Sequence, residues 1–395
     1  MSYKSKLAAS LTPYVAGEQP HGSRIIKLNA NENAYPPSPK AAEVIRNFDA
    51  NSLRLYPKAD SDELREAAAE VNGLQMENVF CANGSDEALA IAFQAFFDSV
   101  RFCDVTYSFY PVWAKLYGLD TEIVPLKDDF SLDADAFAGA KGAVIANPNA
   151  PTGILESLET IRKIANSMDG ILILDEAYAA FSPRTAETLL AELDNLVIVR
   201  TFSKSHALAG LRASYVLSSA ENIETMRMVK DSFNSFPLDS IAQKAAAAAL
   251  RDTDYTNETI SRIVSTREQT AMKLKELGFD VLPSSTNFLF AAPPMDAGEL
   301  MRELKNQGIY VRYFNAPRTR NHLRITLYFR LKVPRKQLLF YHKIKRFSIA
   351  KFIAFYDSIF MHIFMCFQMI NSPFYVTKYE KYIEIILLSR SVFII

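Results

Sequence analysis

The chain has 395 residues, 49% of them hydrophobic and 22% charged. Such values are ordinary for a globular protein with a large core, and they exclude a wholly disordered, collagen-like or coiled-coil chain. Lysine plus arginine and aspartate plus glutamate number 44 each, so whole-chain charge does not favour a nucleic-acid partner. Three cysteines and five scattered histidines predict neither a disulfide framework nor a metal site. Few cysteines and a start without an apolar signal segment (MSYKSKLAAS) indicate a cytoplasmic protein.

The N-terminal part is predicted to be an irregular arm, residues 1–35, because prolines and glycines recur there and a Pro-rich stretch, NAYPPSP, ends it. A helix is then expected from Asp60 to Val71, with Asp60 as its N-cap and Glu63 closing a capping box. The sequence NGS at 83–85 precedes a further helix, which is expected to run from residue 86 to about residue 97.

The middle of the chain alternates between short apolar runs and helical patterns. Helical stretches such as 158–167 separate the first three of four runs, which lie at 143–146, 171–174, 196–199 and 213–217. This alternation predicts an α/β fold, with a large, mostly parallel sheet covered by helices on both faces.

A second, smaller α+β unit is predicted to follow a boundary near residue 250. Helical patterns at 240–250 and 259–277 lead into it, and it contains a strand at 287–291, a helix at 297–307 and a strand at 309–312. The expected organisation is therefore an arm of residues 1–35, a large domain of residues 36–250 and a small domain of residues 251–327.

Residues 328–395 differ in composition from the rest of the chain. They hold 16 of the 46 aromatic residues, none of the 13 glycines, and 11 lysines and arginines against 3 aspartates and glutamates. Without helical period or turn signals, the segment is unlike the end of an α/β domain. Three interpretations stay open: a genuine basic hydrophobic tail, a membrane anchor at 352–370, and an out-of-frame segment replacing the native C-terminus. The polar residues Asp357, His362 and Gln368 weigh against the anchor.

Polar groups follow three of the apolar runs, at the strand ends where α/β sheets bind ligands. The segments are NPNAPTG at 147–153, DEAY at 175–178 and TFSK at 201–204, the last followed by GLR at 210–212. Each has an ordinary alternative: Asp175 as a turn or cap, Lys204 as a solvated lysine, and Ser85 as an N-cap. Their occurrence together, in this order, favours a shared site.

These groups together suit a cationic ring that carries a phosphate. Pyridoxal 5'-phosphate needs a lysine amine for a Schiff base, a carboxylate at the ring nitrogen and donors for its phosphate. Lys204 and Asp175 offer the first two. The phosphate donors would be the backbone N–H groups at the helix N-terminus, with a hydroxyl and a guanidinium: Gly84, Ser85, Asp86, Ser203 and Arg212.

The sequence resembles the fold-type-I aminotransferases and, within them, the histidinol-phosphate aminotransferase subfamily, from about residue 11 to residue 327. The resemblance rests on KLNANENAYPPSP at 27–39, LRLYPKADSDELR at 53–65, NGSDEAL at 83–89, VTYSFYPVWA at 105–114, ANPNAPTG at 146–153, LDEAY at 174–178 and TFSKSHALAGLR at 201–212. It implies a transferase that exchanges an amino group between L-histidinol phosphate and 2-oxoglutarate in histidine biosynthesis. Alternatives are an aromatic-amino-acid aminotransferase, a threonine-phosphate decarboxylase, and, outside the enzyme class, an inactive or membrane-attached relict.

The resemblance also implies roles for single residues. Lys204 would carry the cofactor and move the substrate proton, and Asp175 would pair with the ring nitrogen. The other residues implied to contact the cofactor are Tyr107, stacked on the ring; Asn147 and Tyr178, at the ring oxygen; and Gly84, Ser85, Asp86, Ser203, Arg212 and a partner subunit's Tyr56, around the phosphate. Substrate-binding roles are implied for Arg324 at the carboxylate, for Arg312 and Tyr14 near the substrate phosphate, and for Asn147. Tyr56 further implies a homodimer with shared sites, although Tyr107 and Tyr56 could equally be packing residues.

Some positions depart from the family pattern. Ala207 follows His206 where the family more often has glycine, which affects the freedom of the loop backbone. Cys103 stands where proline is more frequent, and it is expected to be structural. After LRIT at 323–326 the family continues through a glycine turn into a closing helix, whereas this chain continues LYFR. Without that cover we expect a less stable protein.

Overall fold

The computed structural model of the protein describes residues 3–15, 17–20, 22 and 25–327. The chain divides into two compact units, Met1–Gln337 and Leu338–Ile395, and the description below concerns the first. The three interpretations of residues 328–395 lie outside the described residues. Within the described ranges, none of the helices has both the length and the apolar character that crossing a membrane requires.

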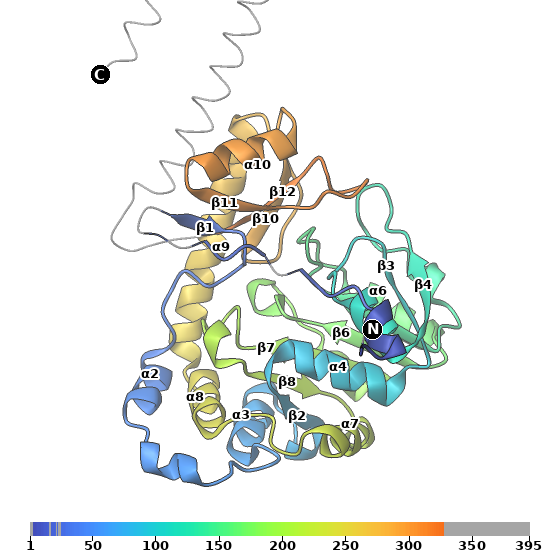
Figure 1. Ribbon diagram of the computed structural model, residues 1–395, viewed down its shortest axis with the longest axis vertical. Coiled ribbons are helices and arrows are strands. Elements are labelled where there is room, and N and C mark those ends of the chain that lie inside the picture. The colour runs from blue at the N-terminus through green and yellow to red at the C-terminus, as the bar shows by residue number, and fades with distance from the viewer. Residues whose placement is uncertain (1–2, 16, 21, 23–24, 328–395) are drawn as a thin grey trace, which may run out of the picture. The chain divides into compact units, whose positions relative to one another are not determined.

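A seven-stranded sheet forms the centre of the structure, as the sequence predicts (Figure 1). Its order is β2-β8-β7-β6-β5-β3-β4, and all neighbouring pairs are parallel except the two made by β8. The strands are β2 Val79–Ala82, β3 Ser99–Cys103, β4 Asp120–Val124, β5 Gly142–Ala146, β6 Ile171–Asp175, β7 Leu196–Thr201 and β8 Ser214–Leu217. The parallel run β7-β6-β5-β3 brings the polar segments that follow these strands to one edge.

Helices cover both faces of this sheet, because successive side chains of its strands point to opposite faces and, outside the edge strand β4, most of them are apolar. Leu172 and Leu174 pack on one face in a core shared with α2 (Pro39–Arg46), α3 (Asp62–Asn72), α6 (Leu158–Ser167) and α8 (Ser240–Leu250). Ile173 and Val199 face the other core, which is shared with α4 (Gly84–Phe96), α5 (Tyr110–Tyr117) and α7 (Ala220–Phe233). The sheet therefore holds the strand ends in a rigid frame.

A second sheet has five strands in the order β1-β11-β12-β10-β9. It consists of β1 Ile26–Leu28, β9 Asp280–Val281, β10 Phe288–Ala292, β11 Ile309–Tyr313 and β12 Leu323–Thr326. The long helix α9 (Thr253–Glu276) leads into it, and α10 (Ala297–Asn306) packs beside β11 (Figure 1). Four of its strands come from residues 280–326, within the predicted small domain, but the boundary near residue 250 stays a prediction.

The arm is more ordered than the sequence indicates. It contains a short helix, α1 (Lys6–Ser10), and β1 pairs in parallel with β11 at the far end of the described chain. A three-residue strand is too short to show an alternating pattern, and it forms because β11 offers an open edge to it. The prediction of an irregular segment throughout residues 1–35 is therefore wrong.

The predicted N-cap of the 60–71 helix is also wrong. The helix begins at Asp62, Ser61 has left-handed backbone angles, and the first turn has no side-chain cap. The Asp60 carboxylate instead accepts hydrogen bonds from Arg227 (2.6 Å) and from the buried Lys230 (3.3 Å). Ion pairs with two cations, one of them buried, take precedence over a capping bond that is worth about 1 kcal/mol.

The connection between β6 and β7 differs from the expected helix and holds only two 3-10 turns, Ala179–Phe181 and Glu187–Ala191. The helix predicted at 259–277 starts earlier, at Thr253, whereas the predicted helices at 158–167 and 240–250 have the observed bounds. The remaining 3-10 turns are Ala50–Arg54, Met76–Asn78, Ala134–Phe137 and Ala209–Leu211.

Candidate active site

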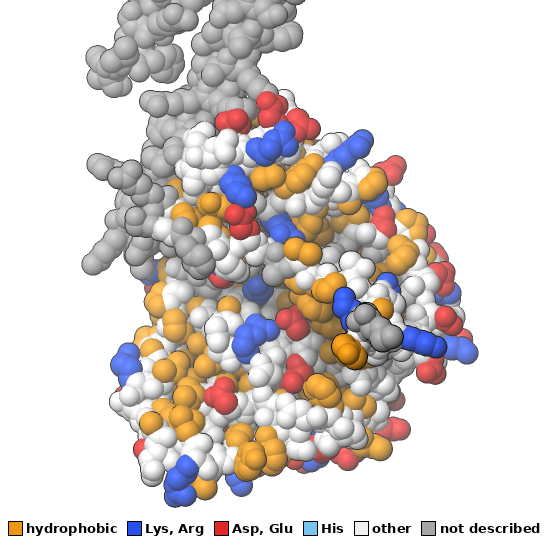
Figure 2. All heavy atoms as spheres, viewed as in Figure 1, with side chains coloured by type: hydrophobic (Ala, Val, Ile, Leu, Met, Phe, Trp, Pro, Cys, Tyr) orange, Lys and Arg blue, Asp and Glu red, His pale blue; other side chains and the backbone are white. Residues whose placement is uncertain are grey.

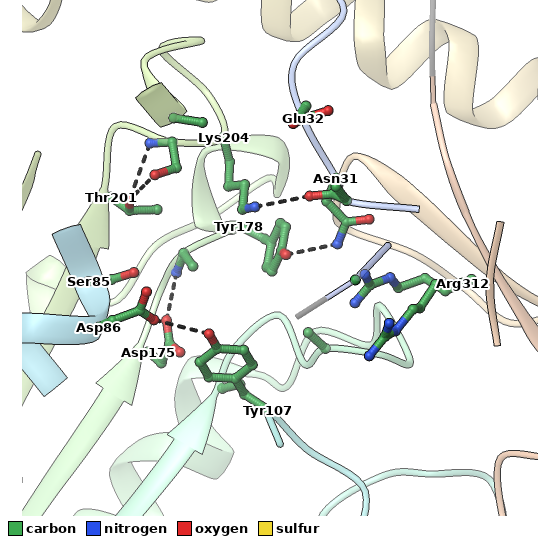
Figure 3. A pocket seen from close by; sticks show the side chains of 18 of the residues that line it. Asn31, Glu32, Ser85, Asp86, Tyr107, Asp175, Tyr178, Thr201, Lys204 and Arg312 are labelled. Carbon is green, nitrogen blue, oxygen red and sulfur yellow. Dashed lines mark hydrogen bonds between the residues drawn. The ribbon is translucent and has the colours of Figure 1, made fainter. Parts of the chain in front are cut away.

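A cavity lies at the edge where β5, β6 and β7 end, with the five-stranded sheet on its other side. Its walls come from five parts of the sequence: the arm, the start of α4, the loop after β3, the loops after β5, β6 and β7, and strands β11 and β12. Figure 3 shows the side chains of Lys204, Tyr178, Tyr107 and Arg312 extending into the space between the strand ends and the five-stranded sheet. Most of the residues predicted for the site meet here.

Lys204 extends from the loop after β7 into this space. Its Nζ donates a hydrogen bond to the carbonyl oxygen of Ala30 in the arm (3.4 Å) and lies 5.8 Å from the centre of the Tyr178 ring (Figure 3). No acidic side chain forms an ion pair with it among the described residues. The amine is therefore held by one long hydrogen bond and is available to a ligand.

Asp175 is the last residue of β6 and only 6% of it is exposed. Its carboxylate accepts hydrogen bonds from the Tyr110 hydroxyl (2.8 Å) and from the backbone N–H of Ala177 (3.1 Å). Burial raises the pKa of Asp175 to about 6, and the two hydrogen bonds oppose that rise. A carboxylate in such a place gains from a cationic partner in the cavity.

Arg212 lies against the first turn of α4. Its guanidinium donates to Asp86 Oδ2 (3.2 Å) and to Ser203 Oγ (3.4 Å). Gly84 opens the helix with a φ of 81°, and a side chain at Gly84 would collide with the guanidinium. The backbone N–H groups of the helix start, the Ser85 and Ser203 hydroxyls and Arg212 together form a cradle that suits a phosphate.

Two tyrosines cover another side of the cavity. The Tyr107 hydroxyl donates to Asp86 Oδ1 (3.0 Å), and burial raises the pKa of Tyr107, so this side chain stays neutral. Tyr14 of the arm stacks on Phe109 with 4.7 Å between ring centres and is tilted against Tyr107 at 6.3 Å. Each ring presents an aromatic face to which a planar ring could pack.

Arg312 and Arg324 face each other across β11 and β12 as directly paired residues. Neither forms an ion pair with an acidic side chain within the described part of the chain, and Arg324 Nε has no hydrogen-bond partner there. Burial lowers the pKa of Arg324, and its guanidinium lies over the Phe288 and Phe314 rings. Like charges opposed in this way are unfavourable, so the pair suits a ligand with one or more negative groups.

Two predicted site residues lie elsewhere. The Asn147 amide is buried and bonds the Glu156 backbone, accepting from its N–H (2.8 Å) and donating to its carbonyl (3.4 Å), and it is not on the cavity wall. The predicted contact between the Asn147 amide and a ligand stays a prediction. Tyr56 is 83% exposed and stacks on Phe236 with 4.8 Å between ring centres. Its predicted contact with a partner subunit stays a prediction.

Comparison with known proteins agrees with this geometry. Residues 23–329 match the family described as aminotransferase class I and II. The chain belongs to that family. A histidinol-phosphate aminotransferase of Clostridium botulinum (strain 657) is 43% identical over 331 residues, which cover 82% of this chain and 94% of that protein. The enzyme of the same name from Acinetobacter baylyi is 44% identical, with 83% and 93% covered.

Among solved structures, this aminotransferase is similar to histidinol-phosphate aminotransferase from Sinorhizobium meliloti, determined in complex with pyridoxal-5'-phosphate. The two chains are 28% identical, the match covers 83% of this chain and 94% of the other, and the TM-score is 0.74. The predicted fold-type-I architecture is confirmed by this likeness.

Residues at the site that were given no role from the sequence include Asn31, Thr201 and Tyr110, and Gln19, Asn29 and Glu32 of the arm also line the cavity. Asn31 donates from Nδ2 to the Tyr178 hydroxyl (2.9 Å) and accepts from Thr326 Oγ1 (2.9 Å), which joins the arm to β12 in this aminotransferase (Figure 3). The motif NANEN at 29–33 belongs to the family resemblance, and polar residues crowded into so short a segment were the available signal. Tyr110 gives no such signal, because in the sequence it looks like a core aromatic residue.

Proposed function

We propose that this chain transfers an amino group between L-histidinol phosphate and 2-oxoglutarate, with pyridoxal phosphate as its cofactor. The observation that carries the proposal is the convergence of Lys204, Asp175 and Arg212 on one cavity, opposite Arg312 and Arg324, which have no acidic partner among the described residues. Relatives more than 40% identical over four fifths of the chain bear the name of this activity.

The residues present fit the cofactor. An amine, a buried carboxylate and a phosphate cradle around Arg212 occur at one cavity, and the guanidinium fits there only because residue 84 has no side chain. When bound, pyridoxal phosphate supplies an electron sink for the substrate carbon and a carbonyl group that takes up the amino group.

In this proposal Lys204 is the residue whose Nζ would hold the cofactor, and the same amine would accept the proton of the substrate α-carbon. Asp175, in its ionised form, keeps the proton on the ring nitrogen, because a close negative charge favours the protonated base. The Tyr107 ring, which lines the cavity, would help to hold the cofactor ring by stacking. Arg324 and Arg312 bind the carboxylate or phosphate of the substrates, and Tyr14 closes the arm side of the cavity.

The proposal includes a homodimer with Tyr56 reaching the partner's site. It is supported by exposed hydrophobic side chains that lie close together around the 3-10 turn Ala50–Arg54 and after α7, namely Leu53, Leu55, Tyr56 and Phe236. Figure 2 shows hydrophobic side chains gathered on the lower part of the molecule, over α2 and the residues that follow it. Apolar surface of this kind is typical of subunit interfaces. Sedimentation velocity of the wild type and of Tyr56→Ser tests the dimer.

The experiment for the activity uses the full chain with pyridoxal phosphate. The wild type should develop a visible absorption band that borohydride removes, and Lys204→Ala should lack it. A substrate panel should show the highest kcat/KM with L-histidinol phosphate. Higher values with aromatic amino acids, or carbon dioxide release from threonine phosphate, would replace the proposed substrate, and a wild type without the band would contradict the proposal.

A further inference from the structure

Tyr110 is a fully buried side chain whose only polar atom is directed at Asp175. It is the first residue of α5 and has no exposed surface, and its hydroxyl donates to Asp175 Oδ2 over 2.8 Å. The other carboxylate oxygen receives the Ala177 backbone N–H. Among the described residues, Tyr110 is thus the one side chain that donates to this carboxylate.

The Tyr110 ring is fixed from several directions. It packs edge-on against Tyr107, with 5.6 Å between ring centres and planes at 86°, and it also touches Phe93, Phe102 and Trp113, each at 6.3 Å. A ring enclosed in this way cannot turn its hydroxyl elsewhere. Replacement by phenylalanine keeps these contacts and removes only the O–H group.

We infer that Tyr110 is a positioning residue, whose hydroxyl keeps the Asp175 carboxylate ionised and oriented for pairing with the ring nitrogen of pyridoxal phosphate. The inference rests on the proposed function, because it assigns Tyr110 a part in the cofactor chemistry proposed for Asp175. A core tyrosine with a purely structural role would have no effect on that nitrogen.

The pKa of Asp175 indicates how its protonation should change when the Tyr110 hydroxyl is removed. Burial raises the pKa of Asp175 to about 6, and the Tyr110 hydrogen bond is the largest opposing influence. Loss of a hydrogen bond to a charged group moves a pKa by roughly one unit or more. Without the hydroxyl, more of Asp175 is protonated at neutral pH, and a neutral carboxyl holds the ring nitrogen's proton less firmly.

The test is Tyr110→Phe loaded with pyridoxal phosphate that is ¹⁵N-labelled at the ring nitrogen, measured by NMR across pH. The protonated fraction of the nitrogen should fall, with its pH midpoint lower by about one unit, and kcat should drop about tenfold while KM changes less than about twofold. Tyr117→Phe is the matched control, since Tyr117 lies at the other end of the same helix and outside the cavity.

A double-mutant cycle with Asp175→Asn separates a positioning effect from a structural one. If Tyr110 acts through Asp175, the Tyr110→Phe change has no further effect on the nitrogen signal in the Asn background. An unchanged nitrogen midpoint in Tyr110→Phe, or an equal effect in both backgrounds, would overturn the inference and leave the proposed function intact. A wild type that does not bind the cofactor would overturn both.

Discussion

The Arg212 guanidinium fills the space beside Gly84 that a β-carbon at position 84 would need. Gly84 also has a φ of 81°, in the left-handed region that glycine adopts most readily. Two independent requirements therefore call for glycine at the start of α4. The consequence is that a positive side chain and a helix N-terminus act on the same point of the cavity.

Gly84→Ala should weaken cofactor binding by at least tenfold. The methyl group strains the backbone by about 1–2 kcal/mol and displaces Arg212 from the cradle. Titration of the cofactor-free protein with pyridoxal phosphate measures the change in Kd. Gly73→Ala is the control, because Gly73 has a φ of 64° but nothing within 4 Å of an added β-carbon. Gly73→Ala should lose stability without losing cofactor binding. Equal Kd values for Gly84→Ala and the wild type would contradict the proposed role of the close contact between Gly84 and Arg212.

In the cofactor-free protein, the free energy of unfolding of Asp175→Asn should rise relative to that of the wild type as the pH increases from about 4 to about 6. The pKa of Asp175 is raised to about 6 in the folded state, from an ordinary 3.8, so the unfolded chain releases this proton first. Wild-type stability therefore falls as pH rises from about 4 to about 6 and stays reduced above, by about 3 kcal/mol. Denaturant unfolding at pH 4 to 7.5 should show the Asn variant gaining on the wild type over that window.

Asp98→Asn serves as the control for this titration, because Asp98 is an exposed aspartate away from the cavity. Its stability curve should run parallel to that of the wild type. Parallel curves for Asp175→Asn as well would mean that Asp175 titrates in the folded protein as it does in the unfolded chain.

Ala207→Gly should raise the free energy of unfolding by roughly 0.5–1 kcal/mol. Ala207 has a φ of 59°, which costs an L-residue about 1–2 kcal/mol, and glycine removes this strain at a smaller entropic cost. The same turn contains Gly210, which has open space around it and no positive φ. Gly210→Ala should therefore be neutral or slightly stabilising. Urea unfolding measures the change, and a loss of stability in Ala207→Gly would contradict the statement that the backbone of Ala207 is strained.

Arg318→Ala should loosen the contact between the loop before β12 and the loop after β4. Arg318 donates to the carbonyls of Leu126 (2.8 Å) and Lys127 (2.6 Å), pairs with Asp104 (2.9 Å) and lies over the Phe130 ring. Without Arg318 these acceptors lose their hydrogen-bond donor, which costs about 1–3 kcal/mol of stability. Hydrogen exchange should accelerate across residues 126–131.

The neighbouring exposed Arg320 provides the comparison, and Arg320→Ala should leave exchange in residues 126–131 unchanged. If both variants behave alike, Arg318 does not hold the two loops together.

The strand-end pattern predicted that Asp175 and Lys204 lie at one edge of the sheet, for a physical reason. Asp175 and Lys204 follow buried strands of a parallel sheet, and that topology alone brings them to one edge. Arg212 follows in the next loop and reaches the same edge. Periodicity likewise placed helices such as 158–167, where one face is apolar and the N-cap is a serine.

Features that depend on distant partners could not be predicted in this way. Asp60 looks like a helix cap, but its carboxylate pairs with Arg227 and Lys230, which lie 167 and 170 residues away in the sequence. Asn147 directly follows β5, where ligand-binding residues of a parallel sheet are expected. Its amide nevertheless bonds the backbone of Glu156, because the loop brings that residue back beside Asn147. The Tyr110 hydroxyl has no local sequence signal either, since only the fold reveals that it ends at Asp175.

The pairing of β1 with β11 determines when the N-terminal strand can fold during synthesis of the chain. Asn31, just after β1, bonds Thr326 across 295 residues of sequence. During synthesis at the ribosome, the N-terminal strand emerges early and must wait for the last described strands before it has an edge to join. Until then its apolar side chains are exposed, so late release of the chain, rather than assembly of the central sheet, should limit the appearance of a complete cavity.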